Sequence, residues 1–169
     1  ISSGEAVPGE GDASQSIASS KVRIQSKVTT FLNLAEVEVY DTTGTNVALN
    51  KNATQSSTFI NQQSHDFPAS NAVNGARDDF THTNDETEPY WEVDLGAVYQ
   101  VQRVIIYNRL NNLEFWAGWY RLSNSVVSLI KDDVVKAVYD IVDASNLSRV
   151  DIAASDFVSN VALNKVATQ

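Results

Sequence analysis

The 169-residue chain contains no cysteine and no methionine, and it has only two histidines. The absence of cysteine excludes disulfides, zinc–thiolate sites and thiol nucleophiles together. No apolar run approaches the roughly 20 residues that a membrane-spanning helix needs, so we expect no insertion into a membrane. A glycine-rich phosphate-binding loop is also missing from the sequence. These absences leave few enzyme classes for which the chain carries suitable residues.

Basic residues are scarce as well: 12 Lys and Arg stand against 21 Asp and Glu, a formal net charge of −9 at pH 7. An acidic surface repels nucleic-acid backbones and anionic lipids, so we expect no nucleic-acid partner. Calcium ions and neutral sugars remain compatible partners. Hydrophobic residues make up 43% of the chain, which is enough for about one domain with a buried core.

Strand-like patterns dominate the chain after a polar N-terminal stretch. Residues 1–20 are rich in Ser, Gly, Ala and acidic residues and predict a linker or a loop. From residue 21 onwards, short segments alternate apolar and polar residues, and Asn-, Asp-, Gly- and Ser-rich turns separate them. The predicted strands cover residues 22–25, 36–40, 91–95, 102–107, 125–130 and 150–152. This pattern predicts an all-β fold, an antiparallel β-sandwich.

The stretch from Val134 to Val142 fits two kinds of structure. Its apolar residues have helical spacing, but most of them are β-branched, which favours a strand. We predict a strand there.

A ten-residue segment occurs twice. NVALNKNATQ at 46–55 returns as NVALNKVATQ at 160–169, with Asn52 against Val166 as the one difference. The two copies are separated by the length of a small domain, not of a solenoid unit. We therefore expect an array of similar domains, in which residues 158–169 begin a following repeat. Two similar strands within one domain are the alternative.

Several segments together resemble the fucose-binding F-type lectin family, within the broader discoidin-like (F5/8 type C) group of galactose-binding domains. They are NVALNKNATQSS at 46–57, NAVNG at 71–75, THT at 81–83, PYWEVDLG at 89–96, VIIYNR at 104–109 and LAEVEVY at 34–40. The resemblance covers most of residues 21–157 and implies a β-sandwich of the jelly-roll type. In this family the segment that matches 34–40 normally closes the domain, whereas here it comes first.

Two arrangements explain this order. Residues 21–40 can finish a preceding repeat, or they can complete the same sandwich as a circular permutation, since the first and last strands of this fold lie close together. If they do not fold back, a strand donated between copies would link them into a polymer, with neighbouring copies as partners.

The resemblance also implies a sugar site. In the family, a His and two Arg hold an axial hydroxyl and the ring oxygen of fucose, and His82 and Arg109 have the family's spacing. Arg121 corresponds best to the second Arg, although it lies several residues later than usual. Arginine presents several fixed donors to hydroxyl oxygens, and a neutral histidine adds one more. Asn111 stands where the family has an Asp that would hold Arg109.

The segment between the two arginines is unusually aromatic and lacks the family's pair of adjacent cysteines. Trp116 or Trp119 can replace the missing sulfur surface and stack on a sugar. The same aromatic residues can instead fill the old pocket or contact a neighbouring repeat.

A structural Ca²⁺ is the second site that the resemblance implies. The family's ligands correspond to the backbone carbonyls of Ala35, Asn71 and Ala76 and the side chains of Glu36, Asn74 and Asp79. Hard oxygen ligands of this kind suit calcium. The alternative is that Asn74 only forms a turn with the next glycine and that Glu36 is an exposed strand residue.

These observations predict an extracellular or cell-surface, calcium-dependent module of a repeated protein that binds fucosylated or related glycans. The alternative is a structural repeat of a surface fibre, sheath or appendage whose sugar site has degenerated. We expect no enzyme, because no nucleophile with a supporting base is apparent. Glycosylation sequons at Asn52 and Asn146 are compatible with secretion.

Overall fold

The computed structural model describes residues 15–109 and 119–160. Its regular structure within these ranges consists of strands and three short 3-10 turns. The strands are β1 (Ile17–Ser26), β2 (Thr29–Thr30), β3 (Glu36–Asp41), β4 (Asn52–Gln55), β5 (Glu86–Thr87), β6 (Tyr90–Tyr107), β7 (Ser125–Lys131), β8 (Val134–Ile141), β9 (Arg149–Ala153) and β10 (Val158–Ser159). The turns are η1 (Ala69–Val73), η2 (Trp119–Leu122) and η3 (Ala154–Asp156). All strand pairs in the described part are antiparallel, so the predicted all-β fold is confirmed.

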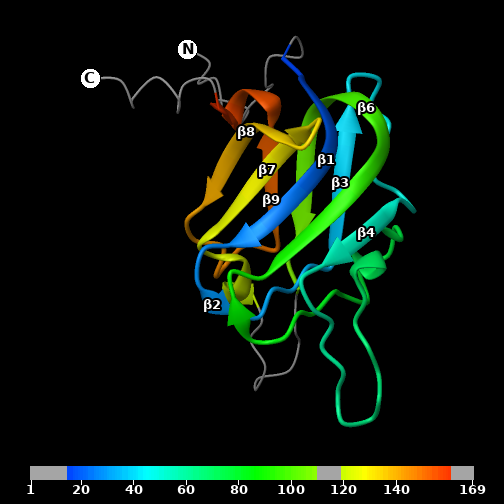
Figure 1. Ribbon diagram of the computed structural model, residues 1–169, viewed down its shortest axis with the longest axis vertical. Helices are drawn as coiled ribbons and strands as arrows, with labels where there is room; N and C mark the ends of the chain where they lie inside the picture. The colour runs from blue at the N-terminus through cyan, green and yellow to red at the C-terminus, as the bar shows by residue number, and fades with distance from the viewer. Residues whose placement is uncertain (1–14, 110–118, 161–169) are drawn as a thin grey trace, which may run out of the picture.

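Strand β6 connects the two layers of the sandwich. It pairs with four other strands, two along its first part and two along its last part. Its first part, from Tyr90 to Asp94, lies between β1 and β4. Its last part, which ends at Tyr107, lies between β3 and β9. Between these parts Gly96 has a φ of 81°, a left-handed conformation that glycine adopts without steric cost. Figure 1 shows β6 rising through one layer, bending over and descending in the other.

The strands of residues 21–40 pair within this same chain. β1 lies between β6 and β7, with Ile24 opposite both Trp91 and Val127. β3 pairs with the end of β6, with Val37 opposite Ile106. The first strand also begins at Ile17, so the last four residues of the predicted linker, 17–20, belong to β1. The array of domains stays a prediction.

Each of the predicted strands has a counterpart in the structure, with one difference in their number. The segments 91–95 and 102–107 belong to the single strand β6. The ambiguous stretch from Val134 forms strand β8, as predicted. Its hairpin with β7 turns through Asp132 and Asp133, both with a φ of 55°, the conformation of a type I′ turn.

The first copy of the repeated segment begins with Asn46, which is bonded to β3. The side chain of Asn46 accepts hydrogen bonds from the backbone N–H groups of Val39 and Ala48, both at 3.1 Å. Val47 and Ala48 are buried. Of the second copy, Asn160 is described and donates to the carbonyl of Val135 at 2.9 Å; the rest lies outside the described residues.

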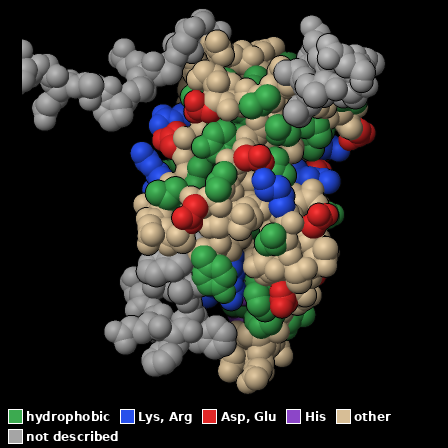
Figure 2. All heavy atoms as spheres, turned by 90° about the vertical axis from the view of Figure 1, so that its left-hand side faces the viewer, with side chains coloured by type: hydrophobic (Ala, Val, Ile, Leu, Met, Phe, Trp, Pro, Cys, Tyr) green, Lys and Arg blue, Asp and Glu red, His purple; other side chains and the backbone are tan. Residues whose placement is uncertain are grey.

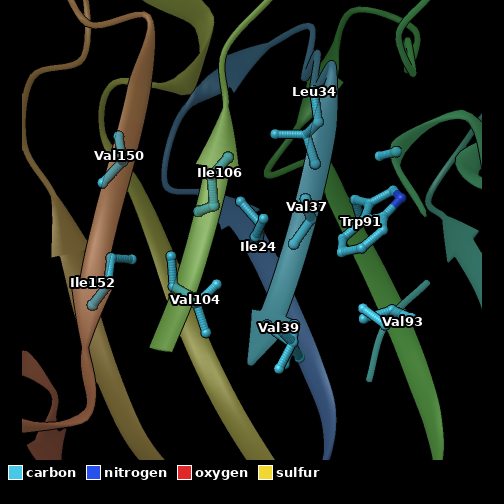
Figure 3. Packing of buried hydrophobic residues seen from close by; sticks show 14 of the residues in the cluster. Ile24, Leu34, Val37, Val39, Trp91, Val93, Val104, Ile106, Val150 and Ile152 are labelled. Carbon is cyan, nitrogen blue, oxygen red and sulfur yellow. The ribbon is translucent and has the colours of Figure 1, made fainter. Parts of the chain in front are cut away.

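The core lies between the layers and consists mainly of β-branched and leucine side chains (Figure 3). Trp91 is the largest fully buried side chain, and its indole Nε1–H donates to the carbonyl of Ala69 at 2.9 Å. This bond attaches η1 to β6, which places the loop after η1 at one end of the sandwich. Among the described residues, no helix is long and apolar enough to cross a membrane.

We expect Trp91→Phe to lower the free energy of unfolding by about 1–3 kcal/mol, because the Ala69 carbonyl loses its buried donor and a cavity remains. Urea unfolding measures the change. Val98→Ala is the control: Val98 is 48% exposed on the same strand, and its change should stay within about 0.5 kcal/mol. Equal effects of the two substitutions would contradict this view of the core.

Candidate functional site

His82 is held in place by the two threonines beside it. The backbone N–H groups of Thr81 and Thr83 donate to the carbonyls of Leu34 and Leu32, at 2.8 and 3.1 Å. The threonine hydroxyls in turn accept from the backbone N–H groups of the same leucines, at 3.1 and 2.8 Å. The THT segment therefore lies antiparallel to residues 32–34, with His82 beside Asn33.

The hydrogen bonds of His82 fix its tautomer. Its Nδ1 lies 2.6 Å from the carbonyl oxygen of Thr83, which can only accept, so Nδ1 carries the proton. Nε2 is then an acceptor and receives a hydrogen bond from Nη1 of Arg121 at 3.2 Å. Burial, followed by the positive charges of Arg121 and Arg109, lowers the pKa of His82 to about 4. The imidazole is therefore neutral at physiological pH.

Arg121 is almost buried in η2, and only part of its guanidinium is engaged. Nη1 donates to Asn33 Oδ1 at 2.7 Å as well as to His82. Its Nε is buried and has no acceptor among the described residues. The Cζ atom lies 4.5 Å from the centre of the Phe31 ring, a cation–π distance. The guanidinium is thus fixed while retaining N–H donors for a ligand.

Arg109 follows the end of β6 and lies over an aromatic ring. Its Cζ atom is 3.7 Å from the centre of the Phe80 ring. Burial, and next the charge of Arg121, lowers the pKa of Arg109 to about 10, so it remains protonated at neutral pH. The structure therefore brings His82, Arg109 and Arg121 together; we call these three residues the trio.

Phenylalanine rings form one wall of the trio. The ring of Phe59 stacks on His82 with centroids 4.6 Å apart, and the ring of Phe67 stacks on Phe80 at 4.8 Å. Phe31 meets His82 edge-on at 5.2 Å. The trio thus combines fixed polar donors with apolar aromatic surface, which is the composition of a pocket for a polar ring with an apolar face.

The remaining residues of the predicted sugar site lie at the limit of the described structure. Asn111 and Trp116 are outside the described residues. Trp119 begins η2, but its side chain is not described. The roles predicted for the two tryptophans stay predictions.

The predicted calcium ligands include two carboxylates with unsatisfied oxygens. Glu36, at the start of β3, is 1% exposed, so the alternative of an exposed strand residue was wrong. Its Oε1 accepts from the N–H of Gly75 at 3.1 Å, while Oε2 has no partner among the described residues. Asp79 Oδ1 is likewise buried and unpartnered there. Burial is the main cause that raises the pKa of Glu36 to about 7.

The other predicted ligands surround the same loop. Asn74 accepts from the backbone N–H of Ala76 at 2.7 Å and donates to Asp79 Oδ2 at 3.0 Å. Asn71 donates to the carbonyl of Phe80 at 3.1 Å. Ala35 precedes Glu36, and its N–H donates to Tyr107. No group of three or more His, Cys, Asp or Glu side chains that could hold a metal occurs in the described ranges, so a cation here would also need carbonyl or amide oxygens.

Both predicted glycosylation residues are at the surface. Asn52 is the first residue of β4 and Asn146 lies in the turn before β9; both are exposed. This position is compatible with modification, which stays a prediction.

Sequence analysis missed the residues that support the trio. Asn33 is a buried polar residue between two buried leucines, and its polarity in an apolar stretch is the signal that could have identified it. The phenylalanines at 31, 59, 67 and 80 lie in loops of irregular pattern, and no periodicity would have grouped them.

In a comparison with known proteins, residues 71–166 match the family model of the NedA-like, galactose-binding domain. A fucolectin of Anguilla anguilla is 34% identical over 94 residues, which cover 48% of this chain and 60% of that protein. Fucolectin-6 of Anguilla japonica is 39% identical over 70 residues, which cover 38% of each chain. The matches thus span less than two thirds of these curated relatives. No solved structure matches the chain.

We expect His82 to be neutral and protonated at Nδ1 throughout pH 5–8, and to titrate near pH 4. Because the pKa of His82 is lower in the folded chain than its usual value of about 6.5, its contribution makes the fold less stable as the pH falls from about 6.5 towards 4. Nitrogen-detected NMR of the imidazole reports both the tautomer and the titration. A proton on Nε2, or a midpoint above pH 6, would refute the assigned geometry.

Proposed function

The chain belongs to the NedA-like, galactose-binding domain family, and on that premise we propose that it is a carbohydrate-binding module for fucose or a related sugar. The observation that carries the proposal is the convergence of the trio from three separate segments onto one end of the sandwich. His82 and Arg121 are in direct contact, and the charge of Arg121 acts on Arg109. The names of the two eel relatives, both fucolectins, support the same class of ligand.

The two arginines of the trio would bind a sugar by donating hydrogen bonds to its oxygens. His82 has no donor left for the sugar, contrary to the expectation from the sequence, because its Nδ1–H is bonded to Thr83 and its Nε2 accepts from Arg121; it would instead orient Arg121. Nη1 of Arg121 is used by Asn33 and His82 and Nε is buried, so Nη2 is the donor left for the ligand. Arg109 would supply a second guanidinium to neighbouring hydroxyl or ring oxygens. The phenylalanine wall would contact the apolar C–H face of the sugar ring. Such a site binds and orients a sugar without any group that attacks it.

A calcium ion would fit the loop between η1 and His82. Glu36 Oε2 and Asp79 Oδ1 are buried oxygens without partners in the described part, and an unpaired buried carboxylate is costly unless a cation or a donor compensates it. Asn74 and the carbonyls of Asn71, Ala76 and Ala35 would complete an oxygen-only ligand set, which calcium prefers. When bound, the ion would neutralise these carboxylates and fix the loop that leads to His82.

We also propose an extracellular module that occurs in repeated copies. The near-identical segments at 46–55 and 160–169 support repetition, and the exposed sequons support passage through a secretory pathway. Weak affinity at each site would then be increased by multivalent binding.

We expect Arg109→Ala to weaken fucose binding by about 10–100-fold, because a charged hydrogen-bond donor is lost at the ligand. A glycan array and calorimetry with L-fucose, both in calcium, measure the effect. Arg23→Ala is the control, since Arg23 lies on β1, paired with Glu92 at 2.7 Å. A folded wild-type chain that binds no glycan would instead favour the structural repeat of a surface fibre, and self-association would then be the property to measure.

Calcium at about a hundredfold above its Kd should raise the thermal midpoint by roughly 5–10 °C. Glu36→Gln should abolish this rise, because it removes the carboxylate but retains an acceptor for the Gly75 N–H. Glu92→Gln, which changes a carboxylate on β6 paired with Arg23, should retain the rise. Differential scanning calorimetry with calcium or chelator makes the comparison. If Glu36→Gln responds to calcium like the wild type, the ion does not bind at this loop.

A further inference from the structure

A second pocket lies next to the trio. Its volume is about 420 Å³, within the usual range for a small-ligand site, and it is lined by Ala35, Arg77, Tyr107, Asn108, Ser148 and Arg149. None of the described residues that line it is acidic. Asn108 lines this pocket, while the next residue, Arg109, belongs to the trio, so the two sites are neighbours at the end of β6.

Arg77 is held rigidly at one side of the pocket. Its guanidinium lies 3.6 Å from the centre of the Tyr107 ring and donates to Glu38 Oε1 at 2.9 Å. Glu38 also accepts from the hydroxyls of Tyr107 and Tyr40, at 3.3 and 3.1 Å. The Arg77 side chain nevertheless remains 54% exposed. Its orientation is therefore fixed in advance, and part of its donor surface faces water.

The Arg149 side chain makes few polar contacts with the described residues. Its Nη2 lies 3.6 Å from Asp151 Oδ2, which is too long for a hydrogen bond. Arg103 pairs with the Asp151 carboxylate instead: its Nε donates to Oδ1 at 2.6 Å and its Nη2 donates to Oδ2. The Arg149 side chain is 53% exposed. Its donors are thus available to a ligand in the pocket.

We propose that this pocket binds the oxyanion of an acidic sugar, either a carboxylate or a sulfate ester. Two guanidinium groups at one pocket match the paired oxygens of such a group, and arginine binds them in bidentate fashion. The adjacency of the trio supports a sugar as the carrier of the anion, and to that extent the inference rests on the proposed function.

The overall charge of −9 does not oppose this inference. Acidic and basic side chains are interspersed on the face shown in Figure 2, and several acids are already paired with arginine or lysine. Charges farther away than about 8 Å are largely screened at physiological salt. The nearby carboxylates are those of Glu38, which is bonded to Arg77, and Asp151, which is paired with Arg103. The charges that line the pocket itself are those of Arg77 and Arg149.

The test is calorimetry of the whole chain with galacturonic acid, galactose 6-sulfate and neutral galactose. We expect at least one acidic sugar to bind about tenfold or more tightly than galactose, with an advantage that falls as salt is added. The tighter of the two acidic sugars identifies carboxylate or sulfate as the preferred group. Equal binding of all three sugars overturns the inference.

Arg149→Gln and Arg77→Gln should each remove most of this advantage. Arg23→Gln is the matched control, since Arg23 also pairs with a glutamate and lies over a tyrosine ring, at 4.5 Å from Tyr90. A loss that is the same in all three variants would overturn the inference, and thermal midpoints check that each variant folds. L-fucose titrated in parallel separates the two sites. Fucose binding without any acidic preference overturns this inference and leaves the proposed function standing. An acidic preference that persists in Arg109→Ala, when fucose binding is lost, shows that the pocket acts independently of the trio.

Discussion

The continuous pairing of strand β6 with four neighbours is the constraint on which the rest of the structure depends. Because β6 passes from one layer into the other, its two ends fix positions in both. Its buried Trp91 holds η1 through the carbonyl of Ala69, and η1 leads into the loop with the unpaired carboxylates. Its C-terminal end at Tyr107 delivers Asn108 to the second pocket and Arg109 to the trio. One strand thus contributes a residue to each of these two candidate sites.

The trio is an arrangement of like charges that needs compensation. Two guanidinium groups close together repel each other, and the lowered pKa of Arg109 reflects burial first and this repulsion next. The rings of Phe80 and Phe31 lie under the two cations at cation–π distances, and neutral His82 accepts from Arg121 instead of adding a charge. A site so arranged attracts oxygen lone pairs, which is the chemistry that a sugar offers.

Much of the fold followed from local pattern, because alternating apolar residues and turn-forming residues act over a few positions. β1, β3, β7 and even the ambiguous β8 were predictable for this reason. The bend of β6 was not, since Gly96 and the pairing with two layers are properties of the whole sheet. In the site, His82 and Arg109 were found because their spacing matches that of the family that the sequence resembles. Asn33 and the phenylalanine wall were missed, because they reach the trio only through tertiary contacts.

The most direct test of the sugar site is a crystal structure of the chain with L-fucose and calcium. The sugar should lie against the phenylalanine wall, with its oxygens within hydrogen-bond distance of Arg109 and of Nη2 of Arg121, and with His82 still bonded to Thr83. A fucose bound elsewhere on the sandwich, or a trio closed by other side chains while fucose binds in solution, would contradict the assignment.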